Sequence, residues 1–145
     1  MFYVNWNDYI NKWVLIKDTL GRWMFGQITE YDDTTGNIKI MYLPKPHEDF
    51  MYTSVPKNSL VDGYCINSWT QFRPTSEKWN DILEKWALLK TFHSKWIFGI
   101  IKDYDKNTNL LKILALNDGS YEFIEYQQAS VIEAWIVDSW TKIES

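Results

Sequence analysis

Short apolar runs alternate with polar turns along the whole chain, and the runs have the length of strands. The run Trp13–Ile16 is bounded by polar residues, which favours a buried strand. The acidic, glycine-containing segment 32–37 separates two longer runs and predicts a β-hairpin. The predicted strands cover 13–16, 23–31, 38–43, 50–55 and 64–72. Five short strands in roughly 70 residues predict a small β-barrel of the SH3-like kind.

The same pattern occurs a second time. With a shift of 73 residues, residues 6–43 align with 79–116 without a gap, and with a shift of 71, Ser68-Trp69-Thr70 aligns with Ser139-Trp140-Thr141. Four pairs of tryptophans coincide: Trp6 with Trp79, Trp13 with Trp86, Trp23 with Trp96, and Trp69 with Trp140. We therefore predict a mostly β protein of two tandem five-stranded barrels, at residues 1–73 and 74–145, produced by an internal repeat.

Details within the repeat refine this prediction. Gly26 and Gly99 interrupt the second strand at the same place, which is typical of the bulge or sharp bend that small barrels require. Spacings of i, i+4 and i+7 before the first strand predict a short helical turn in each copy. In the second copy the run Trp86-Ala87-Leu88-Leu89 leaves a helix open as an alternative to a strand.

Composition narrows the class of protein. The chain has nine Trp, nine Tyr and seven Phe, enough aromatic area for two small cores. The net charge is −4 and Arg22 and Arg73 are the two arginines, so binding to nucleic-acid phosphates is not expected. No run reaches the length of a membrane helix, and the first residues do not resemble a secretory signal. With Cys65 as the single cysteine, the simplest expectation is an intracellular monomer without a membrane segment.

The segments Trp23-x-x-Gly26-x-Ile28 and Trp96-x-x-Gly99-x-Ile101 resemble the second strand of Tudor and Agenet domains, small barrels of the Royal family. An acidic turn, an aliphatic third strand and an aromatic fourth strand follow in both copies, so the resemblance covers nearly the whole chain. It implies a non-enzymatic module that recognises a protein or peptide, basic or methylated, such as a histone tail. A methyl-lysine reader of this kind acts on chromatin and in the nucleus, through cation–π attraction in an aromatic cage.

The same resemblance implies where such a cage would lie: around the turn after the first strand, the start of the second, the end of the third and the loop that follows. In the first copy these places hold Trp23, Tyr42, Asp49 and Phe50, and in the second copy Phe92, Trp96, Asp118 and Tyr121. Because Tyr42 is replaced by Ala115 and the loop is shorter in the second copy, we expect the functional pocket in the first. By contrast, Trp13, Trp69, Trp86 and Trp140 are expected to serve core packing.

Enzymatic chemistry is not indicated. The sequence contains no set of nucleophile, base and orienting group, no phosphate-binding glycine loop and no metal motif, so we expect no cofactor and no metal. Cys65 aligns with Ile136 and is expected to be a small buried residue. Three other functions remain open. The chain could be a structural subunit that docks on a larger protein or ribonucleoprotein assembly, a viral-type protein that blocks a host factor, or a nucleic-acid binder that stacks bases on its aromatics.

Overall fold

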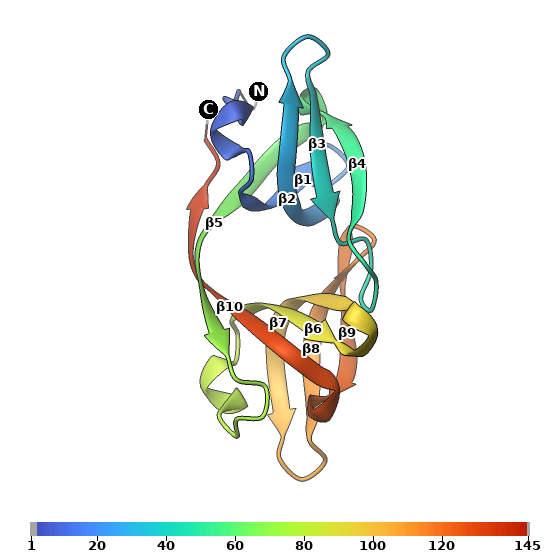
Figure 1. The fold of residues 1–145 in the computed structure, drawn as a ribbon, viewed down its shortest axis with the longest axis vertical. Coiled ribbons are helices and arrows are strands. Elements are labelled where there is room, and N and C mark those ends of the chain that lie inside the picture. The colour runs from blue at the N-terminus through green and yellow to red at the C-terminus, as the bar shows by residue number, and fades with distance from the viewer. Residues whose placement is uncertain (1–2, 145) are drawn as a thin grey trace.

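Ten antiparallel strands form one continuous sheet in the computed structural model, which describes residues 3–144 (Figure 1). The strands are β1 (Trp13–Asp18), β2 (Trp23–Asp32), β3 (Asn37–Tyr42), β4 (Met51–Pro56), β5 (Leu60–Phe72), β6 (Trp86–Thr91), β7 (Trp96–Asp105), β8 (Leu110–Asn117), β9 (Ser120–Gln127) and β10 (Val131–Lys142). Helical structure in the described residues is limited to the short 3₁₀ turns η1 (Trp6–Tyr9), η2 (Lys57–Ser59), η3 (Trp79–Ile82), η4 (Phe92–Ser94) and η5 (Gln128–Ser130). The prediction of a mostly β protein is confirmed, and the second copy forms a strand, β6, where a helix had been the alternative.

The arrangement of the strands differs from the predicted pair of closed barrels. The order is β4-β3-β2-β1-β5-β10-β6-β7-β8-β9, so the sheet is open and its outer strands are β4 and β9. The physical reason is the length of the last strand of each copy: β5 has 13 residues and β10 has 12. Each is long enough to pair with its own copy at one end and with the other long strand at its other end.

The junction between β5 and β10 relates the two halves by an approximate twofold axis. Ser68 lies opposite Ser139, and their hydroxyl oxygens are 2.8 Å apart. On one side of this pair Cys65 lies opposite Thr141, and on the other side the equivalent Ile136 lies opposite Thr70. Figure 1 shows both strands running from one half of the molecule into the other. The repeat in the sequence therefore becomes a symmetric pairing in space.

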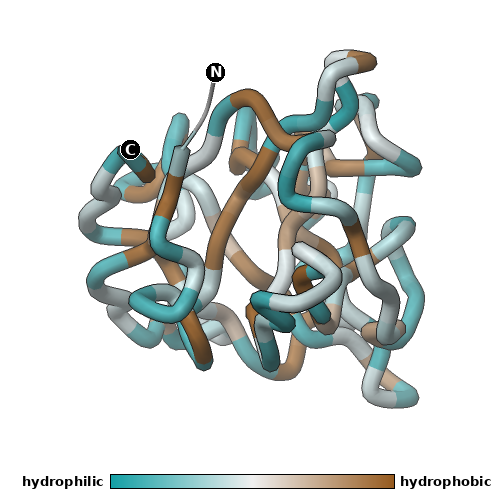
Figure 2. Tube along the Cα trace, turned by 90° about the horizontal axis from the view of Figure 1, so that it is seen from above, coloured by the Kyte–Doolittle hydropathy of each residue, from teal (hydrophilic) through white to brown (hydrophobic). Residues whose placement is uncertain are grey.

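The apolar side chains form three clusters. In the trace of Figure 2, many of the outer turns are hydrophilic. One cluster surrounds Trp6 in the first half, and its equivalent surrounds Trp79 in the second half. The third lies between the halves, where the rings of Phe25 and Phe98 stack with centroids 3.8 Å apart and planes 4° from parallel. Both phenylalanines are fully buried, so the two halves share one of their three cores.

The C-terminal segment belongs in space to the first half. Ile143 is 1% exposed and lies in the cluster around Trp6, and its backbone N–H donates to the carbonyl of Gly63 at 2.9 Å. Figure 1 accordingly shows the two chain ends near each other. The core of the first half is therefore completed by residues from the end of the second copy.

The loops after the third strand of each copy also cross between the halves. In the loop between β3 and β4, His47 donates its N–H to the carbonyl of Trp96 and Glu48 accepts the N–H of Trp96. In the equivalent turn between β8 and β9, the carbonyl of Gly119 accepts the N–H of Trp23 at 2.8 Å. The start of the second strand of each copy is thus held by the loop of the other copy.

Cys65 is expected to react with alkylating reagents only when the sheet opens. It is 4% exposed in β5, which is paired on both sides, and burial raises the pKa of its thiol, so little nucleophilic thiolate forms. We expect alkylation by iodoacetamide at pH 8 to be at least about a hundredfold slower in the native protein than in denaturant. Equal rates would mean that the centre of the sheet opens readily.

Candidate functional site

Seven of the nine tryptophans gather half-buried in the middle of the molecule, where both halves contribute. Trp6 and Trp79 are the exceptions, at 1% and 0% exposed in the separate cores. The seven are Trp13, Trp23, Trp69, Trp86, Trp96, Trp135 and Trp140, and all pack against the central cluster. The expectation of core packing is therefore correct only in part for Trp13, Trp69, Trp86 and Trp140, because each also presents surface to a pocket.

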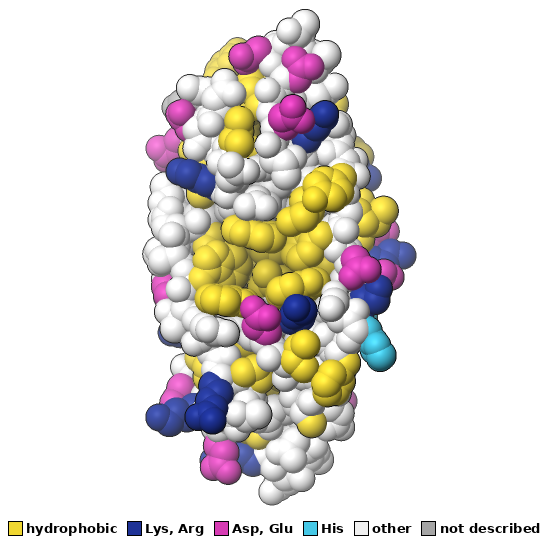
Figure 3. Space-filling model, viewed as in Figure 1, with side chains coloured by type: hydrophobic (Ala, Val, Ile, Leu, Met, Phe, Trp, Pro, Cys, Tyr) yellow, Lys and Arg dark blue, Asp and Glu magenta, His cyan; other side chains and the backbone are white. Residues whose placement is uncertain are grey.

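A stack of four rings crosses the centre and separates two pockets. Trp13 lies on Phe25 with centroids 5.4 Å apart, Phe25 lies on Phe98, and Phe98 lies on Trp86, again at 5.4 Å. The three interplanar angles are 17°, 4° and 22°. Trp86 ends the stack in one pocket and Trp13 ends it in the other. Figure 3 shows the hydrophobic side chains of one face gathered in a hollow between the halves.

The first pocket, here called the acidic pocket, contains five rings and a carboxylate. It has a volume of about 410 Å³, and its lining is Leu15, Trp23, Asp62, Tyr64, Trp86, Tyr121 and Trp140. The neighbouring rings are close: Trp23–Tyr64 at 6.4 Å, Tyr64–Trp140 at 6.3 Å, Trp140–Trp86 at 5.9 Å and Trp86–Tyr121 at 5.5 Å between centroids. Both halves are needed to build it, since Trp86, Tyr121 and Trp140 come from the second copy.

The electrostatics of the acidic pocket suit a cation. Asp62 accepts the N–H of Gly63 at 2.8 Å, which fixes its carboxylate at the wall of the pocket. Burial raises the pKa of Tyr121, so this ring stays neutral and presents an uncharged π-system. One of these rings already contacts a cation of the protein itself, because the ammonium of Lys17 lies 5.7 Å from the ring centroid of Trp23. Ring faces beside a carboxylate attract alkylammonium groups in this way.

The second pocket, here called the neutral pocket, has a similar volume of about 400 Å³ and no charged lining residue. Its lining is Trp13, Met41, Phe50, Trp69, Leu88, Trp96 and Trp135. Phe50 lies 5.5 Å from Trp13 and 5.8 Å from Trp96 between ring centroids, so it bridges the two halves. Such a surface is suited to an apolar group.

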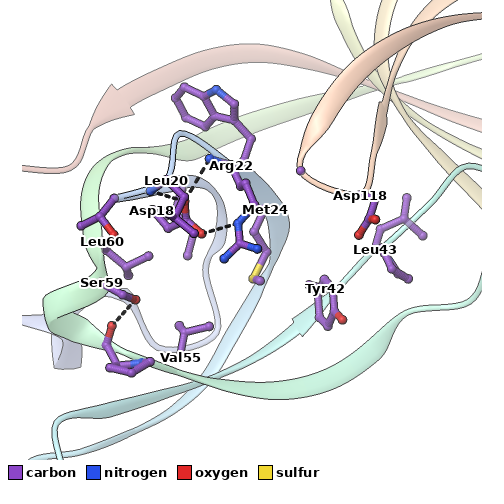
Figure 4. A pocket seen from close by; sticks show the side chains of 16 residues that line it. Asp18, Leu20, Arg22, Met24, Tyr42, Leu43, Val55, Ser59, Leu60 and Asp118 are labelled. Atoms are coloured by element: carbon purple, nitrogen blue, oxygen red, sulfur yellow. Dashed lines mark hydrogen bonds and ion pairs between the residues drawn. The ribbon is translucent and has the colours of Figure 1, made fainter.

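A third cavity, the loop pocket, has a volume of about 640 Å³ and lies at the start of β2 (Figure 4). Asp18 accepts three hydrogen bonds there, two of them from Arg22. Burial alone would raise the pKa of Asp18, but the bonds from Arg22 and Leu20 hold it below its ordinary value. Tyr42 and Asp118 line the other side, and Asp118 reaches it from the second half. This cavity is more polar than the other two.

The residues predicted from the sequence are distributed over all three pockets. Trp23, Tyr42 and Asp118 line the loop pocket; Trp23 and Tyr121 line the acidic pocket; Phe50 and Trp96 line the neutral pocket. Asp49 instead forms an exposed ion pair with Lys95 at 3.1 Å, and Phe92 is 53% exposed on η4. The structure therefore does not bring Trp23, Tyr42, Asp49 and Phe50 to one cage, nor Phe92, Trp96, Asp118 and Tyr121.

Besides Leu15, four aromatic or acidic residues of the acidic pocket were not predicted from the sequence as site residues: Asp62, Tyr64, Trp86 and Trp140. Alignment of the two copies identifies equivalent positions, but it does not say which positions meet across the junction. One feature of the sequence could have indicated this site: an aromatic residue follows an acidic residue by two positions in both copies, at 62 and 64 and again at 133 and 135.

No protein-family model matches the chain, and no curated protein matches it in sequence. Within residues 3–144, no three side chains of His, Cys, Asp or Glu are grouped as the ligands of a metal ion would be. None of the helical segments in the same range is long and apolar enough to cross a membrane.

Proposed function

We propose that the protein is a non-enzymatic binding module, a tandem Tudor-like reader or adaptor that recognises a basic or methylated peptide, with a histone tail as one source. The observation that carries the proposal is the acidic pocket, in which five aromatic rings and the carboxylate of Asp62 surround one cavity. Each well-placed ring stabilises a desolvated alkylammonium by about 0.5–2 kcal/mol. A histone ligand would place the protein in the nucleus, on chromatin.

Two further observations support this function. The net charge of −4 favours encounter with basic partners. In addition, Lys17 over Trp23 is an internal example of the contact that a ligand cation would make with the rings. The likeness to Tudor domains is part of the proposal: we infer that each copy is a Tudor-like unit whose last strand is shared with its neighbour.

A docking subunit of a larger assembly is the second candidate, favoured by the exposed edge of the sheet. Met51 and Tyr52 are adjacent on β4 and are 53% and 75% exposed. β4 is the outer strand of the described sheet, and outer strands offer backbone groups to another chain. This function would not require a ligand cation.

The test is calorimetric titration with trimethyllysine peptides, unmodified peptides and peptides that carry the neutral carbon isostere of trimethyllysine. We expect the methylated cation to bind most tightly. Asp62→Asn should weaken its binding about tenfold, because the carboxylate supplies charge complementarity in a partly solvated site. The amide oxygen of asparagine can still accept the N–H of Gly63, so the fold should be retained.

Glu133→Gln is the matched control, since Glu133 is the acidic residue at the equivalent position of the second copy and does not line the acidic pocket. Its affinity for the methylated peptide should equal that of the wild type. Equal affinity for the cation and its neutral isostere in the wild type, or no binding of either, would contradict the reader function and favour the docking subunit.

A further inference from the structure

The acidic and neutral pockets are equivalent by the internal repeat but differ in one respect that decides what each can hold. Five wall positions correspond: Leu15 to Leu88, Trp23 to Trp96, Trp86 to Trp13, Trp140 to Trp69, and Tyr121 to Phe50; Met41 lines the neutral pocket without a counterpart in the acidic one. The remaining ring is Tyr64 in the acidic pocket and Trp135 in the neutral pocket. The exchange of this one ring changes the state of the neighbouring acid.

Both copies have an acidic residue two positions before that ring, Asp62 and Glu133. In the acidic pocket, Asp62 lines the cavity. In the neutral pocket, the indole N–H of Trp135 donates to Glu133 at 2.6 Å, and Glu133 is not part of the lining. Tyr64 has no indole N–H, and Asp62 instead accepts the backbone N–H of Gly63 and lines its cavity.

An ammonium lies beside the equivalent tryptophan of each pocket, Lys17 at Trp23 and Lys90 at Trp96, so this group does not distinguish the two. The ammonium of Lys90 lies 5.5 Å from the ring centroid of Trp96, which is one wall of the pocket. The difference lies in the carboxylate: a ligand cation in the neutral pocket would meet no acidic residue in the lining, because Glu133 is bound by the indole of Trp135. A cation without such a partner in an apolar cavity is unfavourable. An uncharged apolar group meets no such penalty and gains by leaving water.

We propose that the neutral pocket is a second binding site, which takes an uncharged aliphatic or aromatic side chain of the partner peptide. This inference rests on the proposed peptide-binding function and makes it more specific. The partner combines a cation for the acidic pocket with a neutral hydrophobic residue for the other. The two sites lie at opposite ends of the ring stack through Phe25 and Phe98, so a partner that uses both must cross the junction between the halves.

Two small probes of nearly equal shape separate the sites: choline, which is a cation, and 3,3-dimethylbutan-1-ol, its neutral carbon analogue. Each is titrated into the 145-residue chain, and the indole N–H signals of Trp135 and Trp140 are followed by NMR. Trp135→Phe and Trp140→Phe variants assign the two signals. We expect the alcohol to shift the signal of Trp135 with an affinity at least about fivefold higher than that of choline. Choline should be the preferred probe at Trp140.

The decisive variant is Trp135→Tyr, which gives the neutral pocket the ring found in the acidic one and frees Glu133. We expect the preference at this pocket to reverse toward choline, now followed through the signal of Trp69. Tyr64→Trp is the reciprocal variant and should reduce the preference of the acidic pocket for choline.

The outcomes distinguish this inference from the proposed function. If choline binds at Trp140 and neither probe binds at Trp135, the second site is refuted while the reader function stands. If choline is preferred at both pockets of the wild type, the difference in charge selectivity is refuted. If the alcohol binds at Trp135 and nothing binds at Trp140, the second site stands and the reader function fails.

Discussion

Gly26→Val is expected to destabilise the protein by about 3 kcal/mol or more, because the backbone of the neighbouring strand occupies the space that a side chain would need. A Cβ atom at Gly26 would lie 2.1 Å from the carbonyl oxygen of Met41 and 2.8 Å from the Cα of Tyr42. These are backbone atoms of β3, so the clash is relieved only by moving the strand. Gly99→Val should behave alike, since its Cβ would lie 2.3 Å from the carbonyl oxygen of Leu114. Thermal and urea unfolding measure the effect.

Gly21→Ala is the control for this prediction. Gly21 has a positive φ of 80° and nothing within 4 Å of a built Cβ, so alanine there meets backbone strain but no steric clash. We expect a loss of about 1 kcal/mol. If the valine variants lose no more than this control, β2 and β3 do not approach as closely as described.

Phe25→Ala is expected to lower the free energy of unfolding by about 3–5 kcal/mol and to affect both halves in one transition. The ring is fully buried and stacks on Phe98 of the other half, so its removal leaves a cavity in the shared core. In two independent barrels, the same change would unfold one half and leave the other intact. Methyl NMR signals of Ile38 and Ile113, which lie in the two separate cores, report the halves individually during urea unfolding.

Phe123→Ala is the matched control, because Phe123 is 58% exposed on β9 and its loss leaves no cavity. Its effect should stay within about 0.5 kcal/mol. Separate midpoints for the Ile38 and Ile113 signals in the wild type or in Phe25→Ala would contradict a shared core and restore the view of two independent units.

Local structure was predictable from the sequence because it depends on neighbouring residues. The apolar run before Lys17 forms β1, the acidic turn around Gly36 joins β2 to β3, and the repeat places the same elements in the second half. The pairing of β5 with β10 was not predictable by such means. The mixed apolar and polar pattern of β5 and β10 is the same whether the far end of each strand pairs within its own copy or with the other copy.

The pockets between the halves depend on the pairing of β5 with β10, so they could not be predicted from the sequence for the same reason. Trp86 and Trp140 each have an equivalent tryptophan in the first copy, which suggests a packing role in each core. Their position beside Trp23 depends on the junction at Ser68 and Ser139. Residues that recur within a repeat can therefore line a site between the copies. The predicted Trp23 and Tyr121 reached the acidic pocket because the loops of one half hold the second strand of the other.

The placement of Ile143 has a consequence for the order of events during synthesis on the ribosome. The first 73 residues emerge long before the residues that complete their core, since Ile143 and the end of β10 are translated about 70 residues later. While the second copy is being made, the nascent first copy has an open strand β5 and an unfilled site beside Gly63. Domains that fold as independent units fold in the order of their synthesis. The core of the first half of this chain can instead be completed only once residue 143 has left the exit tunnel.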